Sequence, residues 1–313
     1  MNEQRLTLFP LQHPKIWQFY KKQQACFWLV EEVDLSKDKF KDLTENEQYF
    51  IENILAFFAS ADTIVNINLD TNFSKEVNIL EAEITYRWQM TMEDIHSHMY
   101  SILIETYIKN DRRKNQLFNA VKNIECIKAK ADWAFKWINN EESTPFPQRL
   151  IAFAIMEGIY FSGSFCAIYW LKEQNKMPGL CKSNEFIARD EGLHTEFACF
   201  LYKYIGGNIP EETVHNMIKE AVEIENKFIN HSLPCSLLGM NSNLMYQYIK
   251  FVADWLVVQL GYKSIYNVKN PFVFMQNQGL EGKNNFFESR TSEYQKAHVM
   301  KSKGSTFEEV EDF

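Results

Sequence analysis

Hydrophobic and polar positions along the 313-residue chain recur mostly with the spacing of amphipathic helices, and no useful length alternates as a strand would. Thr44 and Glu47 carry the sequence signature of a capping box, which predicts that a long helix begins there and runs to about residue 69. Further helices are expected over about 74–108, 115–138, 148–172, 184–204, from Pro210 onward, and over about 242–261. The pattern therefore predicts an all-α protein.

Prolines and a change of composition mark the expected breaks between these helices. We expect residues 1–35 to be irregular, with Pro14 among the helix breakers, and Pro178-Gly179 to end a helix. Beyond residue 283 the chain becomes polar and loses its period. These changes predict a helical domain over 1–283 and a flexible tail over 284–313.

Composition narrows the class of protein further. Only 11 glycines and 8 prolines occur, and 46% of the residues are hydrophobic, which favours long helices around a bulky core. A net charge of −8 without a basic patch argues against nucleic-acid binding. The six cysteines are scattered, which favours reduced thiols in the cytoplasm. There is no signal-peptide pattern and no uninterrupted apolar run of about 18 residues, so no membrane span is expected.

Two E-x-x-H motifs are the first candidates for chemistry. Glu93 with His96, and Glu191 with His194, are each three residues apart, which places both side chains on one face of a helix. Those faces also carry bulky apolar residues, and a carboxylate buried alone costs several kcal/mol. No Lys or Arg recurs on the same faces, so a bound metal is the simplest source of the missing positive charge.

A third match to the same motif warns that one copy alone is weak evidence. Glu212 and His215 also have this spacing, but they follow Pro210 directly and fall in the first turn of a helix. Acidic residues are favourable at that end of a helix for electrostatic reasons. We therefore interpret this third copy as a solvated helix start.

Two further acids complete a recognisable set of ligands. Asp62 and Glu157 each interrupt a strongly apolar stretch, and either alone could be a buried acid satisfied by Arg or Tyr. Ferritin-like di-iron bundles use one acid from each of two helices and one E-x-x-H motif from each of the other two. The sequence thus predicts a ferritin-like helical bundle, with a di-metal site between four core helices and additional flanking helices.

The ligand types and their charges favour iron or manganese. Four carboxylates balance the net charge of two ferric ions joined by an oxide, and oxygen and nitrogen donors suit hard metals. Tyr100 lies one turn after His96 on the same face, either within reach of the metal or as an ordinary core tyrosine.

Longer segments carry a resemblance to a known family. AFFASADTIVNINL, MEDIHSHMYSILIETYIK, MEGIYFSGSFCAIYWLK and NEFIARDEGLHTEFAC all resemble the small, radical-generating di-iron subunit of class I ribonucleotide reductase, in its eukaryotic or eukaryotic-virus form. The resemblance covers nearly the whole chain. It implies that the subunit activates O₂ to form a stable tyrosyl radical, which a large subunit uses to reduce ribonucleotides to deoxyribonucleotides.

The resemblance also implies roles for individual residues. Two iron ions per chain, bridged by an oxide, or alternatively manganese, would be held by Asp62, Glu93 and His96 on one side and by Glu157, Glu191 and His194 on the other, with one Glu bridging. Tyr100 matches the radical tyrosine. The apolar pocket that shields the radical matches Phe161, Phe165 and Ile187.

Other matching residues concern transfer of the radical and assembly. Trp28 and Asp190 resemble the relay that joins His96 to the protein surface, and Tyr294 resembles its last tyrosine. The terminal FEEVEDF, Phe307 to Phe313, resembles the peptide that docks on the large catalytic subunit. A homodimer is implied, with neither nucleic acid nor membrane as a partner.

Three alternatives remain at this point. The first is another di-metal carboxylate oxidase or a manganese/iron relative on the same fold, since sequence does not fix the metal. The second is a metal-free homologue that supports an active paralogue, which the presence of all six ligands disfavours. The third is a helical scaffold whose acids are surface charges, which conflicts with the apolar surroundings of Asp62 and Glu157.

Overall fold

The computed structural model describes residues 5–139, 143–232 and 240–275, and helices make up its secondary structure. The α-helices are α1 (Pro14–Ala25), α2 (Glu45–Asn68), α3 (Ser74–Glu76), α4 (Leu80–Tyr107), α5 (Asp111–Phe118), α6 (Ala120–Asn123), α7 (Glu125–Ile138), α8 (Phe146–Ile155), α9 (Ser162–Glu173), α10 (Pro178–Tyr204), α11 (Glu211–Ser232) and α12 (Ser242–Gln259). Two five-residue π-helical turns, η3 (Leu69–Phe73) and η4 (Met156–Tyr160), interrupt longer helical runs, and η1 (Val30–Glu32) and η2 (Phe40–Asp42) are short 3₁₀ turns. The all-α prediction is confirmed, whereas the expected domain boundary at residue 283 lies outside the described residues.

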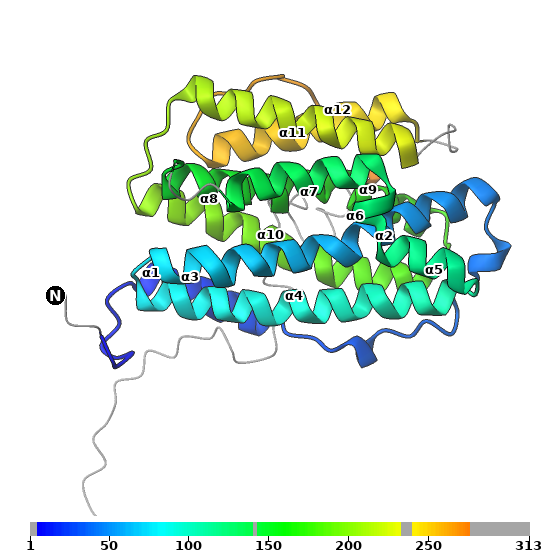
Figure 1. Cartoon of the computed structure of the whole chain (residues 1–313), viewed down its shortest axis with the longest axis horizontal. Coiled ribbons are helices and arrows are strands. Elements are labelled where there is room, and N and C mark those ends of the chain that lie inside the picture. The colour runs from blue at the N-terminus through cyan, green and yellow to red at the C-terminus, as the bar shows by residue number, and fades with distance from the viewer. Residues whose placement is uncertain (1–4, 140–142, 233–239, 276–313) are drawn as a thin grey trace, which may run out of the picture.

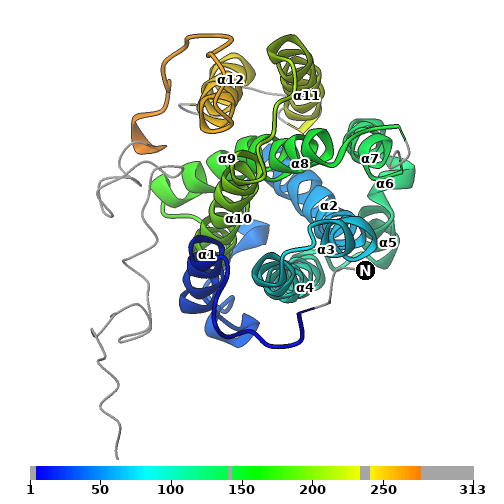
Figure 2. The ribbon, with the colours of Figure 1, turned by 90° about the vertical axis from the view of Figure 1, so that its left-hand side faces the viewer.

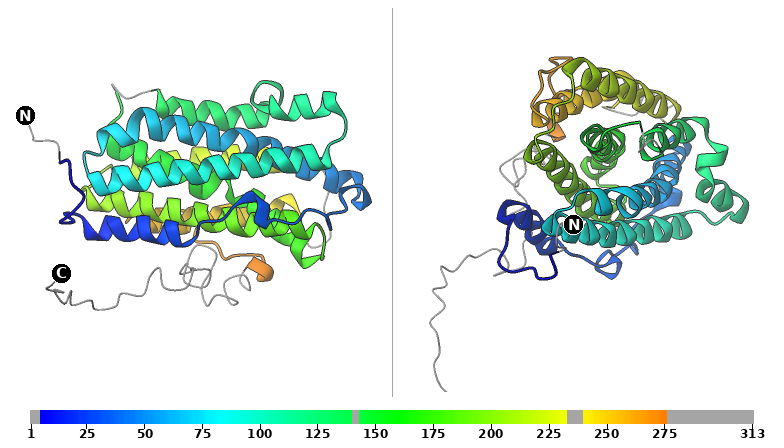
Figure 3. Two further views of the ribbon diagram at one scale, coloured as in Figure 1. Left: turned by 90° about the horizontal axis from the view of Figure 1, so that it is seen from below. Right: turned by 60° about the vertical axis from the view of Figure 1, so that its left-hand side comes forward.

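Four helical runs form the core of the bundle (Figure 1). α2 packs along α4, α10 packs against α4 and α8, and the run α8–η4–α9 lies beside α10. The end-on view shows α11 and α12 together on one side of this core and α4 and α1 on the other (Figure 2). α1 contacts α4 and α10, and the segment after it runs along the outside of the bundle (Figure 3).

The predicted capping box at the start of α2 is confirmed. The Glu47 backbone N–H donates to Thr44 Oγ1 at 3.3 Å, and the Thr44 N–H donates to Glu47 Oε2 at 2.9 Å. The expected helix start near residue 74 is wrong, because α2 continues through η3 and α3 to Glu76. The chain then turns at Asn78, which has a left-handed φ of 47°, and α4 begins at Leu80.

Two expectations about prolines are wrong for the same physical reason. Pro14 lies at the start of α1 and Pro178 at the start of α10, so each begins a helix rather than breaking one. Proline is tolerated in the first helical turn because the N–H that it lacks has no partner there. The polar segment expected as one helix over 115–138 is divided among α5, α6 and α7, with breaks at Asn119 and Ile124.

Two runs are long and apolar enough to cross a membrane by length and composition alone. They cover Glu45–Glu76 and Phe146–Glu173, and their most apolar windows are 67% and 100% buried inside the fold. Burial of this extent is what the core helices of a bundle require, because these two runs supply the surfaces that pack against α4 and α10.

Candidate metal centre

The six predicted ligands converge at the middle of the bundle. Asp62 comes from α2, Glu93 and His96 from α4, Glu157 from η4, and Glu191 and His194 from α10; each is at most 2% exposed. Their ligand atoms form two groups, Asp62–Glu93–His96 and Glu93–Glu157–Glu191–His194, with the atoms of each group within 4.8 Å of one another. Glu93 belongs to both groups, as a bridging carboxylate would.

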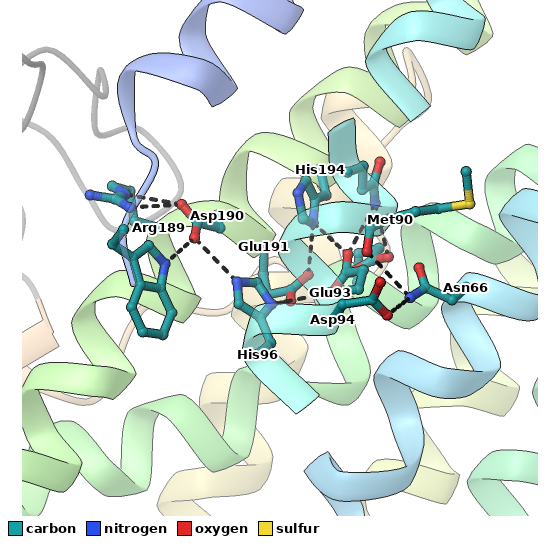
Figure 4. A network of polar contacts seen from close by, with 12 residues as sticks. Asn66, Met90, Glu93, Asp94, His96, Arg189, Asp190, Glu191 and His194 are labelled. Carbon is teal, nitrogen blue, oxygen red and sulfur yellow. Dashed lines mark hydrogen bonds and ion pairs between the residues drawn. The ribbon is translucent and has the colours of Figure 1, made fainter. Parts of the chain in front are cut away.

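The two histidines direct the same ring nitrogen toward shared carboxylates (Figure 4). His96 Nδ1 lies 3.2 Å from Glu93 Oε2 and 3.0 Å from Glu191 Oε1. His194 Nδ1 lies 2.9 Å from Glu93 Oε1 and 3.2 Å from Glu191 Oε2. A metal ion could replace the proton at each Nδ1 and keep these carboxylates as its neighbours.

Two of the four acids in this cluster, Asp62 and Glu157, have oxygens without the partners that burial demands in the part of the chain that the structure describes. Neither carboxylate oxygen of Asp62 has a hydrogen-bond partner within the described residues, and Glu157 Oε2 is also unpaired there. Burial, and then the neighbouring Glu93, hold the pKa of Asp62 well above its usual range. Burial and Glu191 do the same to the pKa of Glu157. The residues therefore fit a di-metal site, since two cations would remove this excess of buried negative charge.

The pKa values of the histidines reflect the same excess. Burial alone would lower the pKa of His194, but the charge of Glu93 and hydrogen bonds to Glu191 and Glu93 raise it to about 9. Burial also opposes protonation of His96, yet hydrogen bonds to Asp190, Glu191 and Glu93 raise its pKa well above the ordinary value. The carboxylates thus create a negative electrostatic potential at both imidazole rings, which attracts cations.

Gln89 is a neighbour of the centre that sequence reasoning missed. Its amide Nε2 lies 3.4 Å from Glu93 Oε1 and 3.4 Å from Glu157 Oε1, and the side chain is fully buried. The amide therefore links carboxylates from two different helices. Its position four residues before Glu93 placed it on the ligand face, which was the available signal.

A second polar network leads from the centre toward α1. His96 Nε2 lies 3.1 Å from Asp190 Oδ2, and the same oxygen accepts a 2.8 Å hydrogen bond from the Trp28 indole. The rings of Trp28 and His96 lie nearly parallel, with centroids 6.1 Å apart. Burial opposes ionisation of Asp190, but Arg189 and these hydrogen bonds lower its pKa. The three expected relay residues His96, Asp190 and Trp28 are therefore in direct contact, and Arg189 is a partner that sequence reasoning missed.

Tyr100 lies in an aromatic pocket beside the acids. It is 2% exposed, and its hydroxyl has no hydrogen-bond partner among the described residues. Phe58 stacks on its ring with centroids 4.7 Å apart and also contacts Phe161 and Phe165 at 5.5 and 5.3 Å. Sequence reasoning selected the last two and missed Phe58, although it shares a helical stripe with Asp62. Ile187, the third expected pocket residue, is likewise buried, on α10.

The remaining candidates fall outside this centre. Glu212 is exposed in the first turn of α11, and His215 Nε2 bonds the Lys263 carbonyl at 2.9 Å, so the interpretation of the third motif as a helix start is confirmed. A scaffold with surface acids is wrong, because the six candidate ligands are buried. Tyr294 and Phe307 to Phe313 lie outside the described residues.

The fold and this site define a ferritin-like di-metal carboxylate protein. A sequence model of the family described as "Ribonucleotide reductase, small chain" matches residues 5–271. The chain therefore belongs to the family of ribonucleotide reductase small chains and is the small subunit of a ribonucleoside-diphosphate reductase, an oxidoreductase. The family resemblance recognised in the sequence is confirmed.

Individual relatives support this assignment over the full length. The chain is 54% identical to the ribonucleoside-diphosphate reductase small chain of Variola virus, with 100% of this chain and 98% of the relative covered. It is also 54% identical to the Neurospora crassa small chain, over 96% of this chain and 74% of the relative. The structure of the ribonucleotide reductase Rnr4 homodimer from Saccharomyces cerevisiae matches with a TM-score of 0.80 and 35% identity, over 90% of this chain and 91% of that one. Dimanganese(II)-NrdF from Streptococcus sanguinis shares the fold with a TM-score of 0.79 at 15% identity, over 87% and 98% of the two chains.

Proposed function

We propose that this chain generates a radical on Tyr100 and supplies it to a large catalytic subunit that reduces ribonucleotides. The observation that carries this proposal is the buried cluster of four acids and two histidines next to a buried phenol. Such a cluster is costly unless cations occupy it, and a phenol in an apolar pocket is suited to one-electron oxidation without side reactions.

In this proposal the two groups of ligands hold two metal ions. Glu93 is shared, with Asp62 and His96 on one side and Glu157, Glu191 and His194 on the other. When bound, the metal pair supplies the redox chemistry with dioxygen that removes an electron from Tyr100. We propose iron, about two ions per chain. Manganese is the second candidate, because a neighbour of the same fold is named as a dimanganese(II) protein.

The surroundings of Tyr100 suit the storage of a radical. Burial, and then the charge of Asp62, raise the pKa of the phenol well above its ordinary value, so the resting side chain keeps its proton. Phe58 covers one face of the ring, and Phe161 and Phe165 pack against Phe58, so this side of the ring is apolar. An apolar shield lengthens the lifetime of a radical because it keeps reductants away.

The contact between His96, Asp190 and Trp28 suits transfer of the radical out of the core. Each member lies within hydrogen-bonding or stacking distance of the next, which is what stepwise electron and proton transfer requires. We propose Tyr294 as the last member of this relay in the chain and Phe307 to Phe313 as the segment that docks on the large subunit.

Assembly and location are proposed on separate grounds. A homodimer is proposed because the Saccharomyces relative is described as one. A cytoplasmic location agrees with the cysteines, since Cys26, Cys126, Cys166, Cys181 and Cys199 are all free within the described part of the chain.

The proposal is tested by loading the metal-free protein with Fe(II) and oxygen. We expect about two irons per chain and a tyrosyl signal in electron paramagnetic resonance. The signal should be lost in Tyr100→Phe while the iron content stays the same, because the hydroxyl carries the radical and is not one of the six ligands. A signal of unchanged size and shape in Tyr100→Phe would rule out this assignment.

A further inference from the structure

The π-helical turn η4 carries a residue of the centre and a residue of the radical pocket at its two ends. Glu157 is its second residue, and Phe161 follows its last residue, Tyr160. A π-helical turn disturbs the regular backbone hydrogen bonds where the helix resumes. Two successive carbonyls at this junction accept hydrogen bonds from side chains: Ile159 O from Ser162 Oγ at 2.7 Å, and Tyr160 O from Lys130 Nζ at 2.9 Å.

Lys130 reaches this junction from α7 and is one of the few fully buried cations in the described chain. Its ammonium lies 2.5 Å from Glu225 Oε2 of α11, and both side chains are at most 1% exposed. It also lies over the faces of Phe57 and Phe228, 3.6 and 3.7 Å from the ring centroids. One carboxylate, two aromatic faces and one backbone carbonyl therefore surround the charge.

The backbone next to this ion pair has a glycine where a larger residue would collide with Glu225. A Cβ atom at Gly163, in the first turn of α9, would lie 2.9 Å from Glu225 Oε1, closer than such contacts occur. Glycine at this position thus lets the carboxylate approach the helix directly after η4. A cavity of about 10 Å³, no larger than a single water needs, lies beside Lys130, Tyr160 and Phe161.

Burial of the Lys130–Glu225 ion pair costs free energy, so stabilisation of the fold alone does not explain it. Burial raises the pKa of Glu225 to about 7 even beside Lys130, and it lowers the pKa of Lys130. Apolar residues of similar volume are often as good as, or better than, a buried ion pair for stability. What they cannot replace is the hydrogen bond from Lys130 to the Tyr160 carbonyl.

We infer that Lys130, held by Glu225, is a positioning residue that fixes η4 in register and thereby sets the places of the Glu157 carboxylate and the Phe161 ring. Neither member of the pair lies in the ligand cluster, so both act through the backbone of η4. The inference rests on the proposed function, because it assigns Glu157 to the metal site.

The test replaces the pair by apolar residues, Lys130→Met with Glu225→Leu, in the full chain. We expect the thermal midpoint of the metal-free protein to stay near that of the wild type. The Mn(II) affinity of the site that contains Glu157, measured by electron paramagnetic resonance titration, should fall by about 10- to 100-fold, as is typical when a partner that orients a ligand is lost. Amide exchange over residues 156–165 should accelerate.

The control breaks an ion pair of Arg149, a second buried cation, on the same helical run as η4; its partner Glu76 is 31% exposed. Arg149 of α8 pairs with Glu76 and also donates to the Thr144 carbonyl, and neither of these partners belongs to η4. Arg149→Met with Glu76→Gln should lower the thermal midpoint without changing Mn(II) affinity. Equal Mn(II) affinities and equal exchange in the Lys130/Glu225 double variant and the wild type would overturn the inference.

A milder variant covers the case in which the double variant does not fold. Glu225→Gln keeps the volume but removes the charge that holds Lys130, so Mn(II) affinity should fall in the same direction. An unchanged affinity would again overturn the inference.

Metal binding by the wild type distinguishes failure of this inference from failure of the proposed function. If wild-type protein binds a pair of neither Fe(II) nor Mn(II) ions, the proposed function fails, whatever the Lys130 variants do.

Discussion

Asp62 shows at the scale of a single residue why a metal is proposed for this core. Both of its carboxylate oxygens are buried and lack hydrogen-bond partners within the described residues. An unpaired buried carboxylate costs several kcal/mol, which is comparable to the total stability of many domains. Evolution toward stability alone would replace such a residue. Its presence beside Glu93 and His96 fits the proposed metal site, since a bound cation would return this free energy.

Gln89 provides a prediction at the same scale. Its amide links Glu93 and Glu157, so Gln89→Leu removes a donor that orients two proposed ligands from different helices. We expect the affinity for Mn(II) or Fe(II) to fall by about 10-fold or more, measured by metal titration of the metal-free protein. Glu212→Ala, in the exposed third motif, is the control and should bind metal as the wild type does. A loss in the control equal to that in Gln89→Leu would contradict this assignment.

The sequence was sufficient to identify residues whose burial costs free energy. It was insufficient for residues whose role depends on a neighbouring helix. Glu93 and His96 could be selected because charged and polar groups on an apolar face need an explanation. Phe58 and Gln89 were missed although their spacing places them on the ligand faces, since phenylalanine and glutamine are unremarkable on a helix. Their importance comes from the rings and carboxylates that other helices bring next to them, and this information is absent from local spacing.

At the scale of elements, the two π-helical turns distinguish this bundle from a set of regular helices. η3 lies after Asp62 on the run from α2 to α3, and η4 includes Glu157 itself. Insertion of a π turn rotates the residues that follow it relative to those before it. Periodicity over 148–172 predicted one continuous helix, and it could not reveal η4 because a single turn hardly changes the apolar pattern of a fully buried segment.

The capping box of α2 allows a prediction with a defined pH dependence. Burial opposes ionisation of Glu47, but the hydrogen bonds with Lys176 and Thr44 lower its pKa below the ordinary value of 4.5. The charged form is therefore favoured in the folded state, and its contribution is present above pH 4.5 and is lost as the pH falls through the lowered pKa. Glu47→Gln should reduce the free energy of unfolding by about 1 kcal/mol at neutral pH, and by less in acid.

The measurement is urea unfolding of the metal-free protein at several pH values. Glu45→Gln serves as the control, because Glu45 is exposed in the same helical turn and does not take part in the capping box. Its smaller effect should come only from the helix dipole. A loss of stability in Glu47→Gln that did not shrink at low pH would show that the ionised carboxylate is not the group responsible.

At the scale of the whole molecule, Tyr100 and His96 differ in their polar contacts. The Tyr100 hydroxyl has no hydrogen-bond partner among the described residues, whereas His96 contacts Asp190, which accepts a hydrogen bond from Trp28, a buried residue shortly after α1. In the proposed function, oxidising equivalents stored on Tyr100 would leave through the contacts that join His96, Asp190 and Trp28. A subunit that must deliver an oxidant to a partner needs this asymmetry.

Delivery also requires that the two subunits meet, and the proposed docking segment can be tested separately from the centre. Phe307 to Phe313 combines two phenylalanines and a valine with four acidic residues, so it offers apolar anchors within a negatively charged peptide. Deletion of these seven residues should abolish ribonucleotide reduction with the large subunit and leave the tyrosyl signal and iron content unchanged, because none of the proposed ligands is removed. A tail with the same seven residues in scrambled order keeps the charge and should also be inactive if the anchors must occupy fixed positions. Full activity in the deleted chain would exclude the docking role, whereas loss of the radical in that chain would mean that the segment supports the centre itself.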